Sequence, residues 1–229
     1  MASVQQLMAS FGGIAKDANY SSVVLLEHMN GANNSTTFTD SGPLGKTATV
    51  VSGAKVTTAL SQFGNGSLVL NGTTDYLTFA ASTSWDFGTG DFTVEGWIYP
   101  TSLSGNHAIC GNRGASSNAE WFFYLAGTHL YFSGGTNDFI VGTYTFTTNS
   151  WYHVALSRVG TTLKSFVNGT QDISVTNSQN FTINQTLGVG CTNAGAYPFA
   201  GNLEDIRITK GVGRYTSNFT VPNAAFPNS

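Results

Sequence analysis

The sequence predicts an all-β fold in which two antiparallel sheets pack face to face as a sandwich. Charged residues make up only 9% of the 229 residues, whereas aromatic residues reach 13% and glycine occurs 27 times. This composition is typical of half-buried strands joined by tight turns. About a dozen short apolar runs also follow one another between turn residues, and no segment has the 3.6-residue periodicity of a long helix.

The length of the chain predicts one domain preceded by a short leader. A chain of 229 residues can form one all-β domain with a hydrophobic core, but it is too short for two such domains. Residues 1–22 show no strand alternation, and a short helix is conceivable only over "VQQLMASF". We therefore expect the domain to span residues 23–229 and the leader, residues 1–22, to act as an attachment arm. A frayed end without a role is the alternative.

The apolar runs define the expected strands in chain order. They begin with "SVVLLEHM" at 22–29 and end with "GNLEDIRIT" at 201–209. Two strands flank Asn71-Gly72, and three lie within "WYHVALSRVGTTLKSFVNGTQDISV" at 151–175. The other expected strands lie in 36–53, where Asp40–Pro43 makes a turn, and in 92–100, 107–112, 120–135 and 183–190.

Asn168-Gly169 is the strongest turn signal in the chain. It separates the two extended runs "LKSFV" and "TQDISV". Both residue types accept a positive φ, which the commonest two-residue hairpin loop requires. The sequence therefore predicts a hairpin here, and we expect a substitution of Gly169 to impair folding rather than binding.

Four segments in this order resemble a laminin G-like domain of the concanavalin A-like kind: "FGNGSLVLNGTTDYLTF", "WDFGTGDFTVEGWIYPTSL", "WYHVALSRVGTTLKSFVNGT" and "FAGNLEDIRITKGVGRYTSNFTVP". The resemblance covers residues 23–227 and implies a jelly-roll sandwich. The ending "GRYTSNFTVPNAAFP" is similar to the versions found in bacteriophage virion proteins. The resemblance does not define a function, because lectins, glycosidases, adhesins and structural proteins share this fold.

Glu95 is a carboxylate in the middle of the apolar strand "FTVEGWIYP". Hydrolases of the resembled fold carry their carboxylates on one strand as Glu-x-Asp-x-x-Glu, and this strand offers only Glu95. We therefore assign no catalytic residue and expect no enzymatic activity. We also expect Glu95 to lie exposed on the polar face, so that Glu95→Gln would scarcely change stability. Alternation places Phe92, Val94, Gly96 and Ile98 on the core face, and Asp91, Thr93, Glu95, Trp97 and Tyr99 on the opposite face.

Aromatic side chains on such a face could stack on the apolar side of sugar rings. The alternative is that these rings fill the core of the sandwich or an oligomer interface, where large aromatic residues are usually found. The wider set of candidates is Trp85, Trp97, Trp121, Trp151, Tyr99, Tyr131 and Tyr144. The sequence-based candidates for glycan binding are Glu95, Trp97, Tyr99 and Trp121.

The adjacent carboxylates Glu204 and Asp205 cannot form a catalytic pair, because neighbours on a strand point to opposite faces. Two interpretations remain open. One is that carboxylates supply oxygen ligands to a structural calcium ion, as the family resemblance implies. The other is that they form salt bridges or accept hydrogen bonds from backbone amides. The candidate calcium ligands are Asp40, Asp75 and Glu204, and no other cofactor is expected.

Several other site types are disfavoured. Nine basic residues are scattered over a chain with a formal net charge of −3, so we expect no nucleic-acid binding. The uncharged stretch 139–157 is interrupted by polar residues, so we expect strands there and no membrane insertion. The four histidines lack the spacing of zinc ligands. Cys110 and Cys191 are expected to be free buried thiols, with one disulfide as the open alternative.

These features and the resemblance together favour a non-enzymatic structural protein on the surface of a bacteriophage virion, in capsid decoration or tail adhesion. The expected partners are other virion proteins and a host cell-surface glycan, and we expect a homo-oligomer, with a trimer as one form. A bacterial extracellular lectin or carbohydrate-binding module is the first alternative. A glycoside hydrolase is a second, disfavoured alternative.

Overall fold

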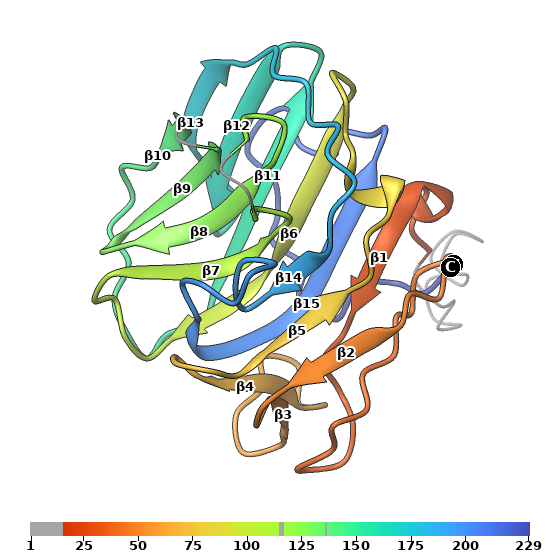
Figure 1. Cartoon of the computed structure of the whole chain (residues 1–229), viewed down its shortest axis with the longest axis vertical. Coiled ribbons are helices and arrows are strands. Elements are labelled where there is room, and N and C mark those ends of the chain that lie inside the picture. The colour runs from red at the N-terminus through yellow and green to blue at the C-terminus, as the bar shows by residue number, and fades with distance from the viewer. Residues whose placement is uncertain (1–15, 115–116, 136) are drawn as a thin grey trace, which may run out of the picture.

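The computed structural model describes residues 16–114, 117–135 and 137–229. The strands form two sheets that pack face to face, and every pair of neighbouring strands is antiparallel (Figure 1). Two single turns of 3-10 helix, η1 (Tyr20–Ser22) and η2 (Thr83–Trp85), accompany them. The predicted all-β sandwich is confirmed.

The larger sheet has eight strands. Its strand order is β13 (Thr170–Thr176), β12 (Thr162–Val167), β11 (Tyr152–Val159), β6 (Phe92–Pro100), β15 (Ala200–Lys210), β4 (Ser67–Asn71) and β3 (Lys55–Thr57). The eighth strand, β1 (Val23–Glu27), pairs with the second half of β15, beyond the part that β4 occupies. We call this the strap-covered sheet, because the C-terminal residues 211–229 cover part of its outer face.

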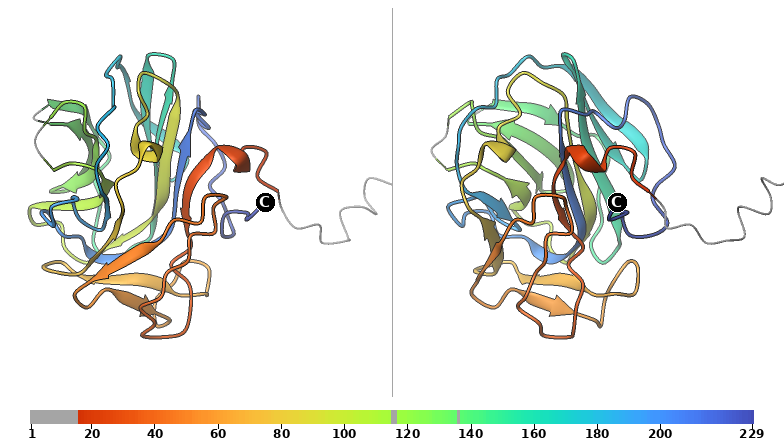
Figure 2. Two further views of the ribbon diagram at one scale, coloured as in Figure 1. Left: turned by 45° about the vertical axis from the view of Figure 1, so that its right-hand side comes forward. Right: turned by 90° about the vertical axis from the view of Figure 1, so that its right-hand side faces the viewer.

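The smaller sheet has seven strands. Its order is β10 (Asn137–Val141), β9 (His129–Gly134), β8 (Phe122–Ala126), β7 (Asn106–Gly111), β14 (Leu187–Val189), β5 (Tyr76–Phe79) and β2 (Ala48–Val51). We call it the open sheet. Figure 2 shows that the two sheets lie beside each other as the layers of the sandwich, with the C-terminus on the side of the strap-covered sheet.

The hydrophobic core lies between the sheets and is rich in aromatic side chains. Val94 and Ile98 of β6 are fully buried in it, as strand alternation predicts. Trp121 is also fully buried there, and its indole Nε1 donates to the backbone oxygen of Trp85 over 2.9 Å. Cys110 and Cys191 are buried free thiols, so the expectation of two unpaired cysteines is confirmed.

A β-bulge in β15 explains the glycine that follows Glu95. The register between β15 and β6 shifts between Glu204 and Arg207, and Asp205 adopts a φ of 54° within the bulge. A Cβ atom on Gly96 would lie 2.4 Å from Cδ1 of Ile206 and 3.2 Å from the backbone oxygen of Asp205. A larger residue here would force the side chain of Ile206 and the bulge to shift, and the bulge turns the carboxylate of Asp205 to the outer face.

The expected boundary at Val23 is wrong for the last part of the leader. The N–H of Asp17 donates to the backbone oxygen of Ser229 over 2.7 Å, and the side chain of Tyr20 packs against Val23, Leu26 and Phe226. Residues 17–22 are therefore part of the folded domain. Residues 1–15, which include the expected short helix and most of the expected attachment arm, lie outside the described residues.

The hairpin at Asn168-Gly169 forms as predicted, with φ values of 48° and 75° that connect β12 to β13. The turn also touches the C-terminal segment. A Cβ atom on Gly169 would lie 2.2 Å from the backbone oxygen of Phe219. Gly160, at the other end of β12, has a similar φ of 56° but no atom within 4 Å of a Cβ.

These two glycines allow a matched test. Gly160→Ala introduces only left-handed backbone strain of about 1 kcal/mol, which corresponds to a decrease of about 2–4 °C in Tm. Gly169→Ala adds a steric clash with Phe219, so we expect at least twice that decrease in thermal unfolding experiments. Equal Tm values for the two variants would show that the turn does not support the C-terminal segment.

Candidate functional site

Glu95 lies at the centre of a buried ionic network on the outer face of the strap-covered sheet. Its Oε1 accepts hydrogen bonds from Nε and Nη2 of Arg207 over 3.0 and 2.8 Å. Its Oε2 accepts one from the hydroxyl of Tyr215 over 2.6 Å and lies 3.3 Å from Nε2 of His153. Glu95 is only 1% exposed, so the expectation of an exposed carboxylate is wrong.

The network continues through Asp17 to a second arginine. One carboxylate oxygen of Asp17 accepts from Nη1 of Arg207 over 3.1 Å, and the two oxygens accept from Nη1 and Nη2 of Arg214 over 2.8 and 2.7 Å. Burial alone would raise the pKa of Glu95, but the charge of Arg207 and the hydrogen bonds of His153 and Tyr215 hold it at about 2. Glu95 is therefore ionised at neutral pH.

The C-terminal segment, residues 211–229, covers this network, and we call it the strap. The ring of Tyr215 stacks on that of Phe219 with centroids 3.6 Å apart, and the ring of Phe226 lies 3.7 Å from the guanidinium carbon of Arg207. The backbone N–H of Phe226 donates to the bulge residue Asp205 over 2.7 Å. The outer face of this sheet is thus occupied by the chain itself.

The four sequence-based glycan candidates do not form a shared surface. Glu95 and Trp97 lie on the same outer face, as predicted, but they are 1% and 6% exposed because the strap and neighbouring rings cover them. Trp121 lies in the core with no exposed area. Among the four, Tyr99 alone is half-buried, and its ring lies 5.4 Å from that of Trp151. Burial therefore contradicts a role as sugar platforms for Glu95, Trp97 and Trp121.

The three candidate calcium ligands are not brought together either. Each carboxylate accepts hydrogen bonds from the backbone amides of a different loop. Asp40 accepts from Leu26, Gly42 and Lys46, Asp75 accepts from Gly53, and Glu204 accepts from Gln62 and Phe63. Within the described residues, no group of three or more histidine, cysteine, aspartate or glutamate side chains is placed to hold a metal ion.

The open sheet carries a cluster of aromatic side chains on its outer face, and we call it the aromatic face. Phe122 and Tyr124 of β8 stack with centroids 4.2 Å apart and form its floor. Tyr131 of β9 lies 5.3 Å from Tyr124, and Tyr197 of the loop between β14 and β15 lies 5.7 Å from Phe122. Tyr131 is half-buried, and Tyr197 is 37% exposed.

Tyr197 is held in a strained backbone conformation. Its φ is 56°, a left-handed value that is costly for a bulky residue. The surrounding loop fixes this conformation. The backbone oxygen of Tyr197 accepts from the N–H of Ala108 over 2.8 Å. The backbone oxygen of Ala196 accepts from the N–H of Thr192, and the N–H of Ala196 donates to Oγ1 of Thr192. Such strain is often found at functional sites, and here it presents an aromatic ring to solvent.

Polar groups flank the aromatic face. The hydroxyl of Tyr124 donates to Oδ1 of Asp138 over 3.0 Å, and Asp138 is exposed. The guanidinium carbon of Arg113 lies 5.6 Å from the ring centroid of Phe122 and 5.8 Å from that of Tyr197. Exposed rings, one carboxylate and one guanidinium thus share one surface.

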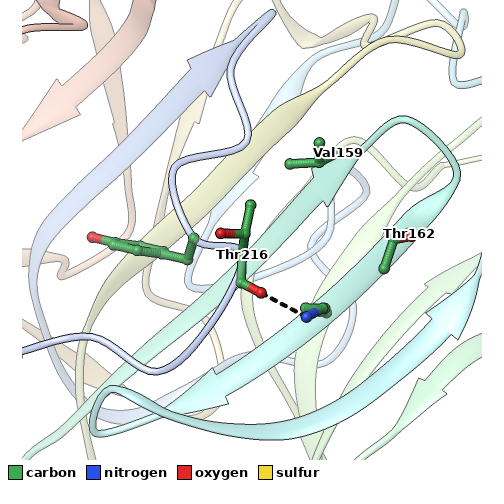
Figure 3. Close-up of a pocket in the computed structure, with 5 residues that line it drawn as sticks. Val159, Thr162 and Thr216 are labelled. Carbon is green, nitrogen blue, oxygen red and sulfur yellow. Dashed lines mark hydrogen bonds between the residues drawn. The ribbon is translucent and has the colours of Figure 1, made fainter.

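Two small hollows lie elsewhere. One, of about 210 Å³, is bounded by the strap and by β11 and β12, where the ammonium of Lys164 donates to the backbone oxygen of Thr216 over 2.6 Å (Figure 3). The other, of about 310 Å³, includes Tyr144 and Asp172, and the carboxylate of Asp172 already accepts from the backbone amides of Thr143 and Tyr144. In both hollows the charged side chain serves to fix a loop.

Sequence reasoning missed Tyr197 and Arg113. Tyr197 lies in the glycine- and asparagine-containing segment "CTNAGAYPF". A bulky ring among such turn residues is a signal that could have marked it as a candidate. Arg113 follows the strand at 107–112 directly, but no sequence pattern places it beside Tyr197. Tyr131 belonged to the wider set of aromatic candidates.

The strand order of the two antiparallel sheets is that of a lectin-like β-sandwich, and the outer face of the open sheet is aromatic. A family model described as the concanavalin A-like lectin/glucanases superfamily matches residues 71–212, more than half of the sequence. The chain belongs to this superfamily. Comparison with curated protein sequences gives no significant match.

Two solved structures with a similar fold were determined with bound saccharide ligands or named for binding. Domain 4 of AbnA, a GH43 extracellular arabinanase from Geobacillus stearothermophilus in complex with arabinotriose, aligns with a TM-score of 0.66 and 18% identity over 83% of this chain and 93% of that chain. The binding domain of botulinum neurotoxin DC in complex with SialylT aligns with a TM-score of 0.62 and 11% identity over 85% of this chain. This chain spans only 50% of that toxin domain. At these identities the likeness is one of fold.

The network around Glu95 gives a prediction with a defined pH dependence. Glu95→Gln removes the carboxylate that accepts two of the hydrogen bonds of buried Arg207 and leaves only Asp17 as its ionic partner, so we expect a loss of about 3 kcal/mol at pH 7, or roughly 6–12 °C in Tm. The folded-state pKa lies below the ordinary value of 4.5, so this stabilisation is present above pH 4.5 and is lost as the pH falls towards 2.

The unfolding free energies of wild type and Glu95→Gln should therefore converge in acid. Asp91→Asn is the control, because Asp91 is partly exposed and accepts one hydrogen bond from the N–H of Gly160. We expect that control to cost less than about 1 kcal/mol. A Glu95→Gln protein as stable as wild type at pH 7 would contradict the ionic role of Glu95.

Proposed function

We propose that this protein is a non-catalytic glycan-binding domain on the surface of a bacteriophage virion, and that the aromatic face of the open sheet binds the glycan. The observation that carries the proposal is the exposed ring of Tyr197, which a strained backbone and a hydrogen-bonded loop hold beside Arg113 and Phe122 on the aromatic face. A fold that bears the cost of such strain gains from the position of that ring.

The chemistry of the aromatic face suits a sugar ring. The C–H face of a pyranose packs on an aromatic ring, while hydroxyl groups need hydrogen-bond donors and acceptors at the rim. Tyr131 and Tyr197 would supply the ring surface, and Asp138 would accept from a hydroxyl. Phe122 and Tyr124 lie beneath as a rigid floor, so little side-chain entropy would be lost on binding.

The comparisons support a carbohydrate ligand at a coarse level. The matched superfamily is named for lectins and glucanases, and the AbnA domain was solved with arabinotriose. Another structure of this fold belongs to a study in which the entry of botulinum neurotoxin type C into cells depends on two ganglioside molecules. These ligands belong to those proteins, and they indicate the class of molecule to test first.

Two features support a binding role without catalysis. The carboxylate in the strand where hydrolases of this fold would carry their catalytic pair is Glu95, and it is buried and bound to Arg207 and Tyr215. Hydrolysis of a glycosidic bond needs two carboxyl groups that flank the bond. The carboxylate at the rim of the proposed site, Asp138, accepts a hydrogen bond from the hydroxyl of Tyr124, which suits it to accept from a sugar hydroxyl as well.

The position of the chain ends supports an outward orientation of the aromatic face. Asp17 and Ser229 are joined by a backbone hydrogen bond on the side of the strap-covered sheet (Figure 2). A capsid or tail partner that holds the segment before Asp17 would lie on that side. The open sheet would then face away from the particle and towards a host cell. The virion setting itself rests on the sequence resemblance of residues 213–227.

Substitution of Tyr197 by glycine tests both the proposed function and the backbone strain at this residue. Tyr197→Gly removes the ring and allows the positive φ, so we expect binding on a glycan array to weaken at least about tenfold while Tm stays equal or rises. Tyr144→Ala is the control, because Tyr144 is similarly exposed but lies outside the aromatic face.

The outcomes separate clearly. Loss of binding in Tyr197→Gly with unchanged binding in Tyr144→Ala supports the aromatic face as the site. Wild-type glycan binding in Tyr197→Gly, or loss only in Tyr144→Ala, would refute it.

A further inference from the structure

Arg113 differs from the other described arginines in its contacts. The guanidinium groups of Arg158, Arg207 and Arg214 all donate hydrogen bonds to buried oxygens of the protein. In the part of the chain that the structure describes, no hydrogen bond or ion pair involves the Arg113 side chain, although it is partly buried. Arg113 therefore presents a cation that no described side chain pairs with in a salt bridge.

Two aromatic rings restrain the guanidinium of Arg113 and leave its N–H groups unused. Its guanidinium carbon lies between 5 and 6 Å from two ring centroids, 5.6 Å for Phe122 and 5.8 Å for Tyr197. Cation–π contact restrains the plane of the guanidinium, while its five N–H groups remain free to donate. A restrained guanidinium binds a carboxylate in the two-pronged geometry that both groups favour.

The groups around Arg113 favour an anionic group on the ligand. Asp138, a carboxylate on the aromatic face, is bonded to Tyr124 at Oδ1, and among the described residues no ion pair joins Asp138 to Arg113. An anionic group would thus bind at Arg113, a sugar ring would lie on Tyr197, and a hydroxyl would reach Asp138. Such a division of contacts matches an acidic sugar with both a carboxylate and hydroxyl groups.

We propose that the aromatic face recognises glycans that carry carboxylate groups, such as uronic or sialic acid residues, through a bidentate contact with Arg113. This inference rests on the proposed function, because it names the ligand class of the same site. Arg113 would decide specificity for charge, whereas Tyr197 and Tyr131 would supply affinity for any sugar ring.

The test compares ligands that differ in their carboxylate. Calorimetric titrations of the full chain would use oligogalacturonic acid and its carboxyl-reduced form, and sialyllactose and lactose. We expect the acidic member of at least one pair to bind at least about tenfold more tightly. Arg113→Gln should abolish this preference, because the acidic member then binds no more tightly than the neutral member.

Two further variants serve as controls. Arg113→Lys keeps the charge without the planar fork and should retain only part of the preference. Lys55→Gln removes one positive charge from an exposed position on β3 and should change nothing. Equal binding of acidic and neutral members, or an unchanged preference in Arg113→Gln, would overturn the inference while the proposed function stands. No binding of any glycan on the array or in the titrations would overturn both.

Discussion

The ion pair between Glu95 and Arg207 is the interaction on which the covering of the strap-covered sheet's outer face depends. It joins the centre of β6 to β15, and Asp17 extends it to Arg214 at the start of the strap. Charges buried in this way are stable only when each has a partner and further hydrogen bonds. Here Tyr215 and His153 complete the surroundings of Glu95, and the ring of Phe226 covers Arg207.

This network makes the two faces of the sandwich unequal. The bulge at Asp205 aims a carboxylate at the strap, and Gly96 leaves the space that the bulge needs. The strap therefore closes one outer face with residues of the same chain. The opposite face presents the rings of Tyr131 and Tyr197 to solvent, with Tyr197 in a strained conformation, so this face is available to an external ligand.

Much of the fold followed from local sequence signals. Alternation placed Val94 and Ile98 in the core and Glu95 on the outer face, and Asn168-Gly169 marked its hairpin correctly. The environment of Glu95 could not be predicted, because its partners come from residues near 17, 153, 207 and 215, far apart in the chain. The proposed site was missed for the same reason, since Arg113 and Tyr197 meet only when β7 and the loop after β14 are adjacent.

Hydrogen–deuterium exchange of the strap tests the central role of the network most directly. Asp17→Asn weakens the link between Arg207 and Arg214 without altering the core. If the network holds the strap, the amides of Phe219 and Phe226 will exchange faster in this variant, and exchange in β7, β8 and β9 will be unchanged. Strap protection equal to that of the wild type would show that the ionic network does not hold the strap, and would contradict the account.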